Sequence, residues 1–191
     1  MTEPLHVYSI GAAGDISADD WDRLSNPPSQ SYDPFISHGF FTSLEESGSA
    51  TSETGWRPMH LIAEDDNQQI VGIMPLYLKG HSQGEYVFDH GWARGFEMAG
   101  GQYYPKLLSA VPFTPVTGRR LFALAADEKT VRPALIKAAI ELGVKWQLSS
   151  LHINFVAEEL IDCLKEEQLL IRHDTQFHWG NHGFTEFEQF L

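Results

Sequence analysis

The chain has 191 residues, of which 42% are hydrophobic and 12% aromatic, enough to bury the core of a single domain. Its 26 acidic and 13 basic residues give a formal net charge of -13, which argues against binding to duplex nucleic acid or to anionic membranes. The single cysteine, Cys163, excludes an intramolecular disulfide and a thiolate zinc cluster. No stretch approaches the roughly 20 apolar residues of a membrane span, and the N-terminus lacks a signal-peptide pattern. We therefore expect a soluble, cytoplasmic protein without membrane insertion.

The first part of the chain predicts a strand, two helices and a hairpin. Ser17 and Ser37 are the predicted N-caps of the helices, because a serine hydroxyl accepts a hydrogen bond from a first-turn N–H. Alternating apolar runs predict strands at residues 5–10, 57–65 and 68–80. The second and third of these form a hairpin, and Pro75 predicts a bulge or an edge within the third.

The second part predicts alternating helices and strands. A short helix is expected within residues 91–101, a longer one from Thr130 to Gly143 and a third at 157–169, with strands at 106–113, 149–156 and 170–181. The last residues, 184–191, resemble the start of a helix. This order predicts an α/β fold in which a mixed sheet is flanked by helices.

A segment free of carboxylates is the best candidate for binding an anion. No acidic residue occurs between Glu97 and Asp127, whereas Lys106, Arg119 and Arg120 are retained. The two arginines follow the strand at 106–113, where ligands collect in α/β sheets, and guanidinium groups pair with phosphate in a bidentate manner. The alternative is a basic loop that only balances an acidic surface.

Candidate acid–base residues precede this segment. Glu85, Asp89 and His90 are the candidate catalytic bases, because an amine acceptor must lose a proton before it attacks an acyl group. Aromatic residues beside them are candidates for contacting the acceptor: Trp92, Tyr103 and Tyr104. In the alternative interpretation Asp89 caps a turn, the aromatic side chains pack in the core and His90 is simply exposed.

A metal site is not expected. His173 and His178 are five residues apart on a predicted strand and so face opposite sides, and His182 follows a glycine and an asparagine. Cys163 lies among apolar helix positions, which favours a buried thiol over a nucleophile.

Four long stretches resemble the FemAB-like predicted N-acyltransferases. They are PFISHGFFTSLEESGS, GWRPMHLIAEDDNQQIVGIMPLYLKGHSQGEYVFD, GGQYYPKLLSAVPFTPVTGRRL and FHWGNHGFTEFEQFL. The resemblance implies a GNAT-like acyltransferase fold that transfers an acyl or aminoacyl group to an amine or peptide acceptor. It implies acyl-CoA or aminoacyl-tRNA as the donor, and a peptidoglycan precursor as the acceptor of related Fem enzymes. No clean copy of the Q/RxxGxG/A loop, with which GNAT enzymes hold pyrophosphate, occurs here.

The resemblance also implies two GNAT-like domains in tandem. Residues 1–191 correspond to the first as a single domain, so we expect a second GNAT-like half or self-association to complete the protein. A noncatalytic module that recognises a peptide or a peptidoglycan precursor is the alternative function.

Overall fold

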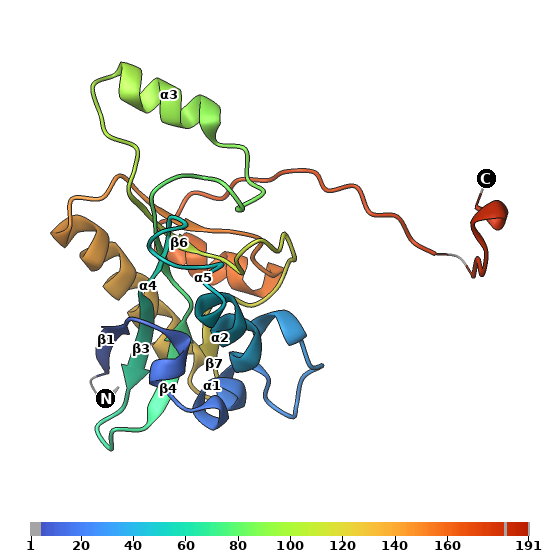
Figure 1. Ribbon diagram of the computed structural model, residues 1–191. Helices are drawn as coiled ribbons and strands as arrows, with labels where there is room; N and C mark the ends of the chain where they lie inside the picture. The colour runs from blue at the N-terminus through green and yellow to red at the C-terminus, as the bar shows by residue number, and fades with distance from the viewer. Residues whose placement is uncertain (1–4, 182, 191) are drawn as a thin grey trace.

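The computed structural model describes residues 5–181 and 183–190 (Figure 1). Its strands are β1 (His6–Ile10), β2 (Trp56–Pro58), β3 (His60–Glu64), β4 (Ile70–Met74), β5 (Tyr77–Lys79), β6 (Lys106–Ser109), β7 (Phe122–Ala123) and β8 (Leu151–Ile153). Its α-helices are α1 (Ala18–Ser25), α2 (His38–Glu46), α3 (His90–Met98), α4 (Glu128–Lys145) and α5 (Ile161–Glu166). Short 3-10 turns lie at Ala13–Asp15, Pro34–Ile36, Glu158–Leu160 and Phe187–Gln189. The expected mixed α/β class is confirmed.

Local capping starts the first two helices as the sequence predicts. The Ser17 hydroxyl accepts from the Asp20 N–H at 3.0 Å, and the Ser37 hydroxyl accepts from the Phe40 N–H at 3.3 Å. Trp21 anchors α1 in the core, where it is fully buried and donates its indole N–H to the Ile36 carbonyl at 2.9 Å. Both helices therefore pack on the sheet through an aromatic layer.

The hairpin contributes to two four-stranded sheets, where the sequence predicted one mixed sheet. The first has the order β1-β3-β4-β7 and the second the order β2-β5-β6-β8. The chain passes between the sheets at Met59 and at Pro75, which lacks an N–H to donate to a ladder and interrupts its strand as expected. The Met59 N–H donates to the Leu76 carbonyl at 2.8 Å, and the His60 Nδ1 accepts from the Leu76 N–H at 3.1 Å. These bonds hold the junction between the sheets.

Helix α4 connects the only parallel pair of strands among the described residues. β6 runs antiparallel to β5 and parallel to β8. Parallel neighbours need a crossover, and α4 supplies it while packing Val131, Leu135 and Ala139 against the sheets. The helix continues past the predicted end at Gly143 to Lys145. It ends there because Gln147 has a φ of 53° and the Leu148 N–H donates back to the Gly143 carbonyl at 2.9 Å, as in a helix C-cap.

The prediction of a strand at 170–181 is wrong. This stretch has no regular secondary structure and runs away from the body of the molecule (Figure 1). Leu170 and Phe177 are almost fully exposed, so the alternation of apolar residues finds no face to cover and the backbone pairs with no strand in the described part of the chain. The expected terminal helix is only the turn at Phe187–Gln189; Leu191 lies outside the described residues.

None of the helices within residues 5–181 and 183–190 has the length and apolar character that crossing a bilayer requires.

Candidate functional site

Two lysines lie side by side inside the second sheet. Lys79 on β5 pairs with Lys106 on β6, and both side chains are fully buried. Because side chains alternate along a strand, both ammonium groups lie on one face of the sheet. Leu78 and Leu107 point to the opposite face, where they join the core packed by α4. The lysine face is covered by the β5–β6 connection, residues 80–105.

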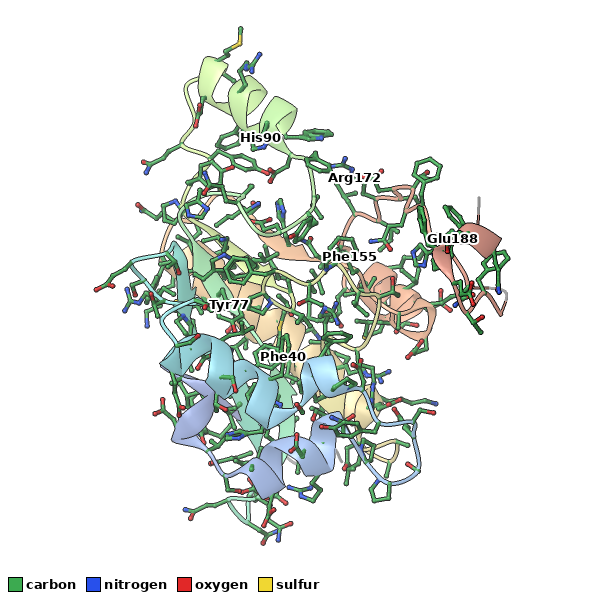
Figure 2. All side chains as sticks on the ribbon, turned by 45° about the vertical axis from the view of Figure 1, so that its right-hand side comes forward. Phe40, Tyr77, His90, Phe155, Arg172 and Glu188 are labelled. Atoms are coloured by element: carbon green, nitrogen blue, oxygen red, sulfur yellow. The ribbon has the colours of Figure 1, made fainter. Side chains whose placement is uncertain are left out.

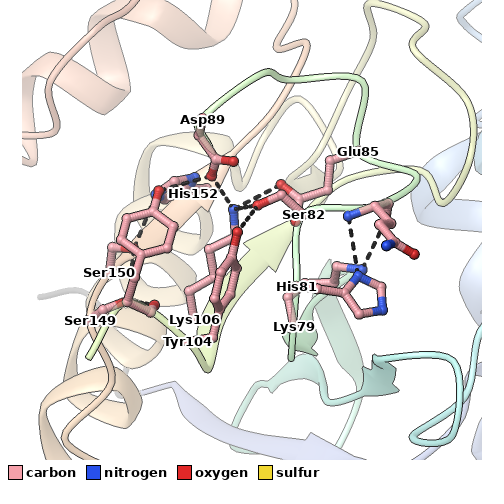
Figure 3. A network of polar contacts seen from close by, with 12 residues as sticks. Lys79, His81, Ser82, Glu85, Asp89, Tyr104, Lys106, Ser149, Ser150 and His152 are labelled. Carbon is pink, nitrogen blue, oxygen red and sulfur yellow. Dashed lines mark hydrogen bonds and ion pairs between the residues drawn. The ribbon is translucent and has the colours of Figure 1, made fainter. Parts of the chain in front are cut away.

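Lys106 is bound by three acceptors from that connection (Figure 3). Its Nζ donates to the Ser82 hydroxyl at 3.0 Å, to Glu85 Oε2 at 2.9 Å and to Asp89 Oδ2 at 2.6 Å. An ammonium group has three N–H donors, so Lys106 is fully satisfied. Both carboxylates are about as buried as the lysine, which makes this a closed ion-pair cluster rather than a surface salt bridge.

Two tyrosines complete the walls of the cluster. Tyr103 donates its hydroxyl to Asp89 Oδ2 at 2.8 Å, and the Tyr104 hydroxyl shares a 2.8 Å hydrogen bond with Ser82. The Lys106 Nζ lies 5.5 Å from the Tyr103 ring centroid and 5.8 Å from that of Tyr104. These distances add cation–π attraction to the ion pairs.

The pKa values of the two carboxylates are shifted in opposite directions. Burial raises the pKa of Glu85, and the charge and hydrogen bond of Lys106 only partly oppose it. Burial also acts on Asp89, but the hydrogen bond from Lys106 and that from Tyr103 outweigh it and lower the Asp89 pKa to about 2. Paired groups whose pKa values are driven apart in this way are typical of acid–base sites.

Lys79 is less firmly held than Lys106. Its Nζ donates to the Gln83 carbonyl at 3.2 Å and lies 3.6 Å above the Trp56 ring. Burial lowers the pKa of Lys79 to about 7, although the charge of Glu85 opposes this. The sequence analysis did not identify Lys79 as a site residue, because a single lysine in an apolar strand carries no motif.

His152 joins the cluster from β8. It is paired with Leu108 and lies on the face of the sheet that also carries Lys106. Its Nε2 is 3.0 Å from the Ser150 hydroxyl, and burial and the nearby Lys106 charge lower its pKa to about 4. One ligand atom each from His152, Glu85 and Asp89 lies within 4.8 Å of the others. No motif points to His152, because this residue reaches the site only through the pairing of β6 with β8.

Four of the eight predicted site residues are brought together and four are not. Glu85, Asp89, Tyr103 and Tyr104 meet at Lys106. His90 and Trp92 instead lie exposed on α3, which projects from the molecule (Figures 1 and 2).

The two predicted arginines lie elsewhere, on the loop before β7. Arg120 is 1% exposed, and its guanidinium donates to the carbonyls of Asn154 at 3.0 Å, Arg119 at 2.8 Å and Val116 at 2.5 Å. It therefore fastens this loop to the end of β8. Arg119 is half-buried, and burial lowers its pKa while the charge of Asp33 opposes the shift.

The side chains of Lys106, Glu85 and Asp89 are closed to solvent, with at most 2% of each exposed. One surface cavity, of about 380 Å³, lies beside Trp179 and Phe190, and another, of about 420 Å³, lies beside Asp20 and Arg23. Neither of these two cavities is lined by a residue of the cluster. His173 and His178 lie exposed on the C-terminal segment, and His182 is outside the described residues.

One protein-family model matches nearly the whole chain. A model of the FemAB-like family, described as peptidoglycan biosynthesis/recognition, matches residues 12–191. No curated protein sequence matches the chain.

Solved structures whose backbone follows a similar path include acetyltransferases. An aminoglycoside 6′-N-acetyltransferase from Acinetobacter baumannii is 12% identical with a TM-score of 0.49, over 95% of this chain and 99% of that one. The corresponding enzyme from Acinetobacter haemolyticus is 14% identical with a TM-score of 0.48, over 94% and 99%. An acetyltransferase from Trypanosoma brucei is 12% identical with a TM-score of 0.49, over 93% and 99%. Likeness at this level carries no argument about substrate or mechanism.

The assignment rests on the family model, which spans nearly the whole chain and agrees with the resemblance of its four long stretches. The chain belongs to the FemAB-like family.

Proposed function

We propose that this protein is a GNAT-like N-acyltransferase that transfers an acyl or aminoacyl group to an amine. The family assignment supports the reaction class. The observation that carries the proposal is the buried cluster in which Glu85 and Asp89 share the Lys106 ammonium while their pKa values move in opposite directions.

Each carboxylate has its own role in the proposed reaction. An amine arrives as an ammonium ion and attacks a carbonyl carbon only after it loses a proton. Glu85 is the proton acceptor, because burial raises its pKa and its Oε1 has no hydrogen-bond partner among the described residues. Asp89 stays ionised and, with Lys106, fixes the geometry. Direct attack needs no covalent intermediate on the protein.

Residues around the cluster supply the proposed contacts to the substrates. Tyr103 and Tyr104 contact the acceptor beside its nitrogen, and Trp92 on α3 contacts a more distant part of it. Arg119 is the proposed partner for an anionic group of the donor, because Arg120 is already engaged with carbonyl groups of the chain. The proposed donor is an acyl-CoA or an aminoacyl-tRNA, and the proposed acceptor is the amine of a peptidoglycan-precursor peptide.

Product formation by mass spectrometry tests the proposal. The full chain is incubated with acetyl-CoA or with aminoacyl-tRNA, and with a peptide that carries a free side-chain amine. We expect an acylated peptide, and a loss of about 100-fold or more in rate for Glu85→Gln, within the range that general-base groups contribute. Glu97→Gln, an exposed carboxylate on α3, is the matched control and should retain the rate.

Two results would overturn the enzyme proposal. One is a folded protein that binds no donor and forms no product with any of these pairs. The other is an unchanged rate in a folded Glu85→Gln variant. Peptide binding without donor binding would instead support the noncatalytic recognition module.

A further inference from the structure

The hydrogen bonds of the cluster leave acceptors that Lys106 does not serve. Its three N–H groups already go to Ser82, Glu85 Oε2 and Asp89 Oδ2. The second oxygens, Glu85 Oε1 and Asp89 Oδ1, are buried and have no hydrogen-bond partner within residues 5–181 and 183–190. Each such oxygen costs about 1–3 kcal/mol or more when it stays unpaired, since carboxylates are strongly solvated in water. Both belong to carboxylates that bind the same ammonium group, and they point to a donor that comes from outside the chain.

His152 adds a third acceptor at the same place. Its imidazole lies within 4.8 Å of both carboxylates, yet Lys106 donates nothing to it. A neutral imidazole has one ring nitrogen that accepts, and burial beside Lys106 keeps His152 neutral by lowering its pKa to about 4. One ligand atom from each of the two carboxylates and one from His152 therefore lie close to one another.

The separation of these groups admits an ammonium nitrogen. One ligand atom from each of Glu85, Asp89 and His152 lies within 4.8 Å of the other two. A tetrahedral nitrogen with three hydrogen bonds of about 2.8 Å separates its acceptors by about 4.6 Å, which this limit allows.

Charge balance also favours a single positive charge. Lys106, Glu85 and Asp89 together carry a net charge of -1 when both carboxylates are ionised. Lys79 lies on the same face, and burial lowers its pKa to about 7, which weakens its contribution of positive charge. One monovalent cation then neutralises the buried cluster, whereas a divalent ion would leave it positive.

We propose that Glu85, Asp89 and His152 form a second cation position beside Lys106, and that this position binds a primary ammonium group. A primary ammonium offers three N–H donors to three acceptors, whereas a quaternary ammonium offers none. The identification of this ammonium with the acceptor amine rests on the proposed function. It limits the acceptors to primary amines, because secondary and more substituted ammonium groups offer fewer than three N–H donors.

In the proposed reaction the ammonium loses one proton to Glu85. The free amine nitrogen then forms a bond to the acyl carbon, and the bond from that carbon to the sulfur or oxygen of the donor breaks. The second proton of the nitrogen leaves with the departing thiolate or alkoxide, so that a thiol or an alcohol is released. The proton held by Glu85 passes to water.

Binding of small ammonium ions to the full chain, without any donor, tests the site. Methylammonium and ethylammonium are titrated to roughly 0.1 M, a range that detects millimolar affinity, with tetramethylammonium at equal ionic strength as the control. Carboxyl and imidazole NMR signals report on Glu85, Asp89 and His152. We expect saturable shifts at all three residues with the primary ammonium ions, and none with tetramethylammonium.

Variants locate the binding. Asp89→Asn should remove the saturable shifts, and His152→Leu should weaken binding about tenfold, the effect of one lost hydrogen bond to a charged group. His6→Gln, on the exposed edge strand β1, should bind as the wild type does. Circular dichroism shows whether each variant is folded, and a rise in Tm of the wild type with methylammonium gives a second measure that needs no variant.

Several outcomes would overturn the inference. They are equal shifts with methylammonium and tetramethylammonium, no saturable shift at any concentration, or shifts at these residues with Zn²⁺ or Mg²⁺ alone that methylammonium does not compete away. Acyl transfer without ammonium binding would refute this site and leave the proposed function standing. Ammonium binding without acyl transfer would do the reverse.

Discussion

Replacing Lys106 with methionine should strongly destabilise the protein at neutral pH. The side chain keeps its volume, but Glu85 and Asp89 lose the ammonium that lies 2.9 and 2.6 Å from their oxygens. All three groups are almost fully buried, so water does not replace the lost bonds.

The expected loss follows from the pKa of Asp89. The ammonium helps to hold this pKa at about 2 against an ordinary value of 3.8, which corresponds to about 2 kcal/mol. The contribution is present above the unfolded-state pKa and disappears as the pH falls through about 2, because the folded-state pKa is the lower one. Glu85 is left unpaired as well, so we expect a total loss of about 3–5 kcal/mol at pH 7, as for other broken buried pairs.

Urea unfolding at pH 7 and at pH 4 measures this effect. The difference between Lys106→Met and wild type should shrink at pH 4, where the variant can neutralise its buried carboxylates by protonation. Lys137→Met is the matched control: Lys137 forms a 3.4 Å pair with Glu167 but is 63% exposed, so its loss should stay below about 1 kcal/mol. A loss of less than 1 kcal/mol in Lys106→Met at pH 7, or one that is the same at both pH values, would show that the buried ion pairs of Lys106 contribute little to stability.

Three further predictions test other parts of the fold. Burial lowers the pKa of His152 to about 4 from 6.5, so between these pH values the unfolded chain binds a proton that the folded chain does not. As the pH falls through this range, the free energy of unfolding of the wild type, measured in urea, should fall by on the order of 3 kcal/mol. The His152→Leu variant should lose less, and equal losses in the two proteins would contradict this prediction. Gly72→Ala in β4 should lower stability by about 1–3 kcal/mol in thermal unfolding, because the new methyl group would lie 2.2 Å from the Val131 side chain of α4. The control Gly95→Ala lies on exposed α3, where the methyl group would meet no atom within 4 Å, and it should not destabilise the protein. Equal effects of the two substitutions would be inconsistent with this packing. Glu45→Ala should lower the free energy of unfolding in urea by about 3 kcal/mol. One oxygen of this carboxylate accepts from the His60 ring at 2.8 Å, and the other accepts from the Ala13 N–H at 2.8 Å. A change below 1 kcal/mol would show that these hydrogen bonds contribute little to stability.

Much of the local structure could be predicted because its causes lie within a few residues. The hydroxyls of Ser17 and Ser37 cap helices whose first turns follow directly, and both caps are confirmed. Pro75 interrupts its strand for a reason internal to the residue, the missing N–H. The strand at 170–181 failed for the opposite reason: alternation indicates a strand only when a partner and a covered face exist.

The candidate site was predicted in part. Glu85 and Asp89 were predicted as candidate bases, and the structure brings them together with Tyr103 and Tyr104. Nothing in the sequence, however, distinguishes their position from that of His90, which follows Asp89 directly and is exposed on α3. Adjacent residues at the start of a helix point in different directions, and only the packing of the connection decides which of them enters the core.

The family, the mixed α/β class and the beginnings of the first two helices could be predicted from the residues alone, because they depend on long matching stretches and on local hydrogen bonds. The central position of Lys106 in the cluster, with Lys79 and His152 beside it, depends on the folded structure. Pairing of β5 with β6 and of β6 with β8 sets these three side chains on one face. The proton affinities of the cluster then follow from burial and from the distances between charges, neither of which is a property of any single residue.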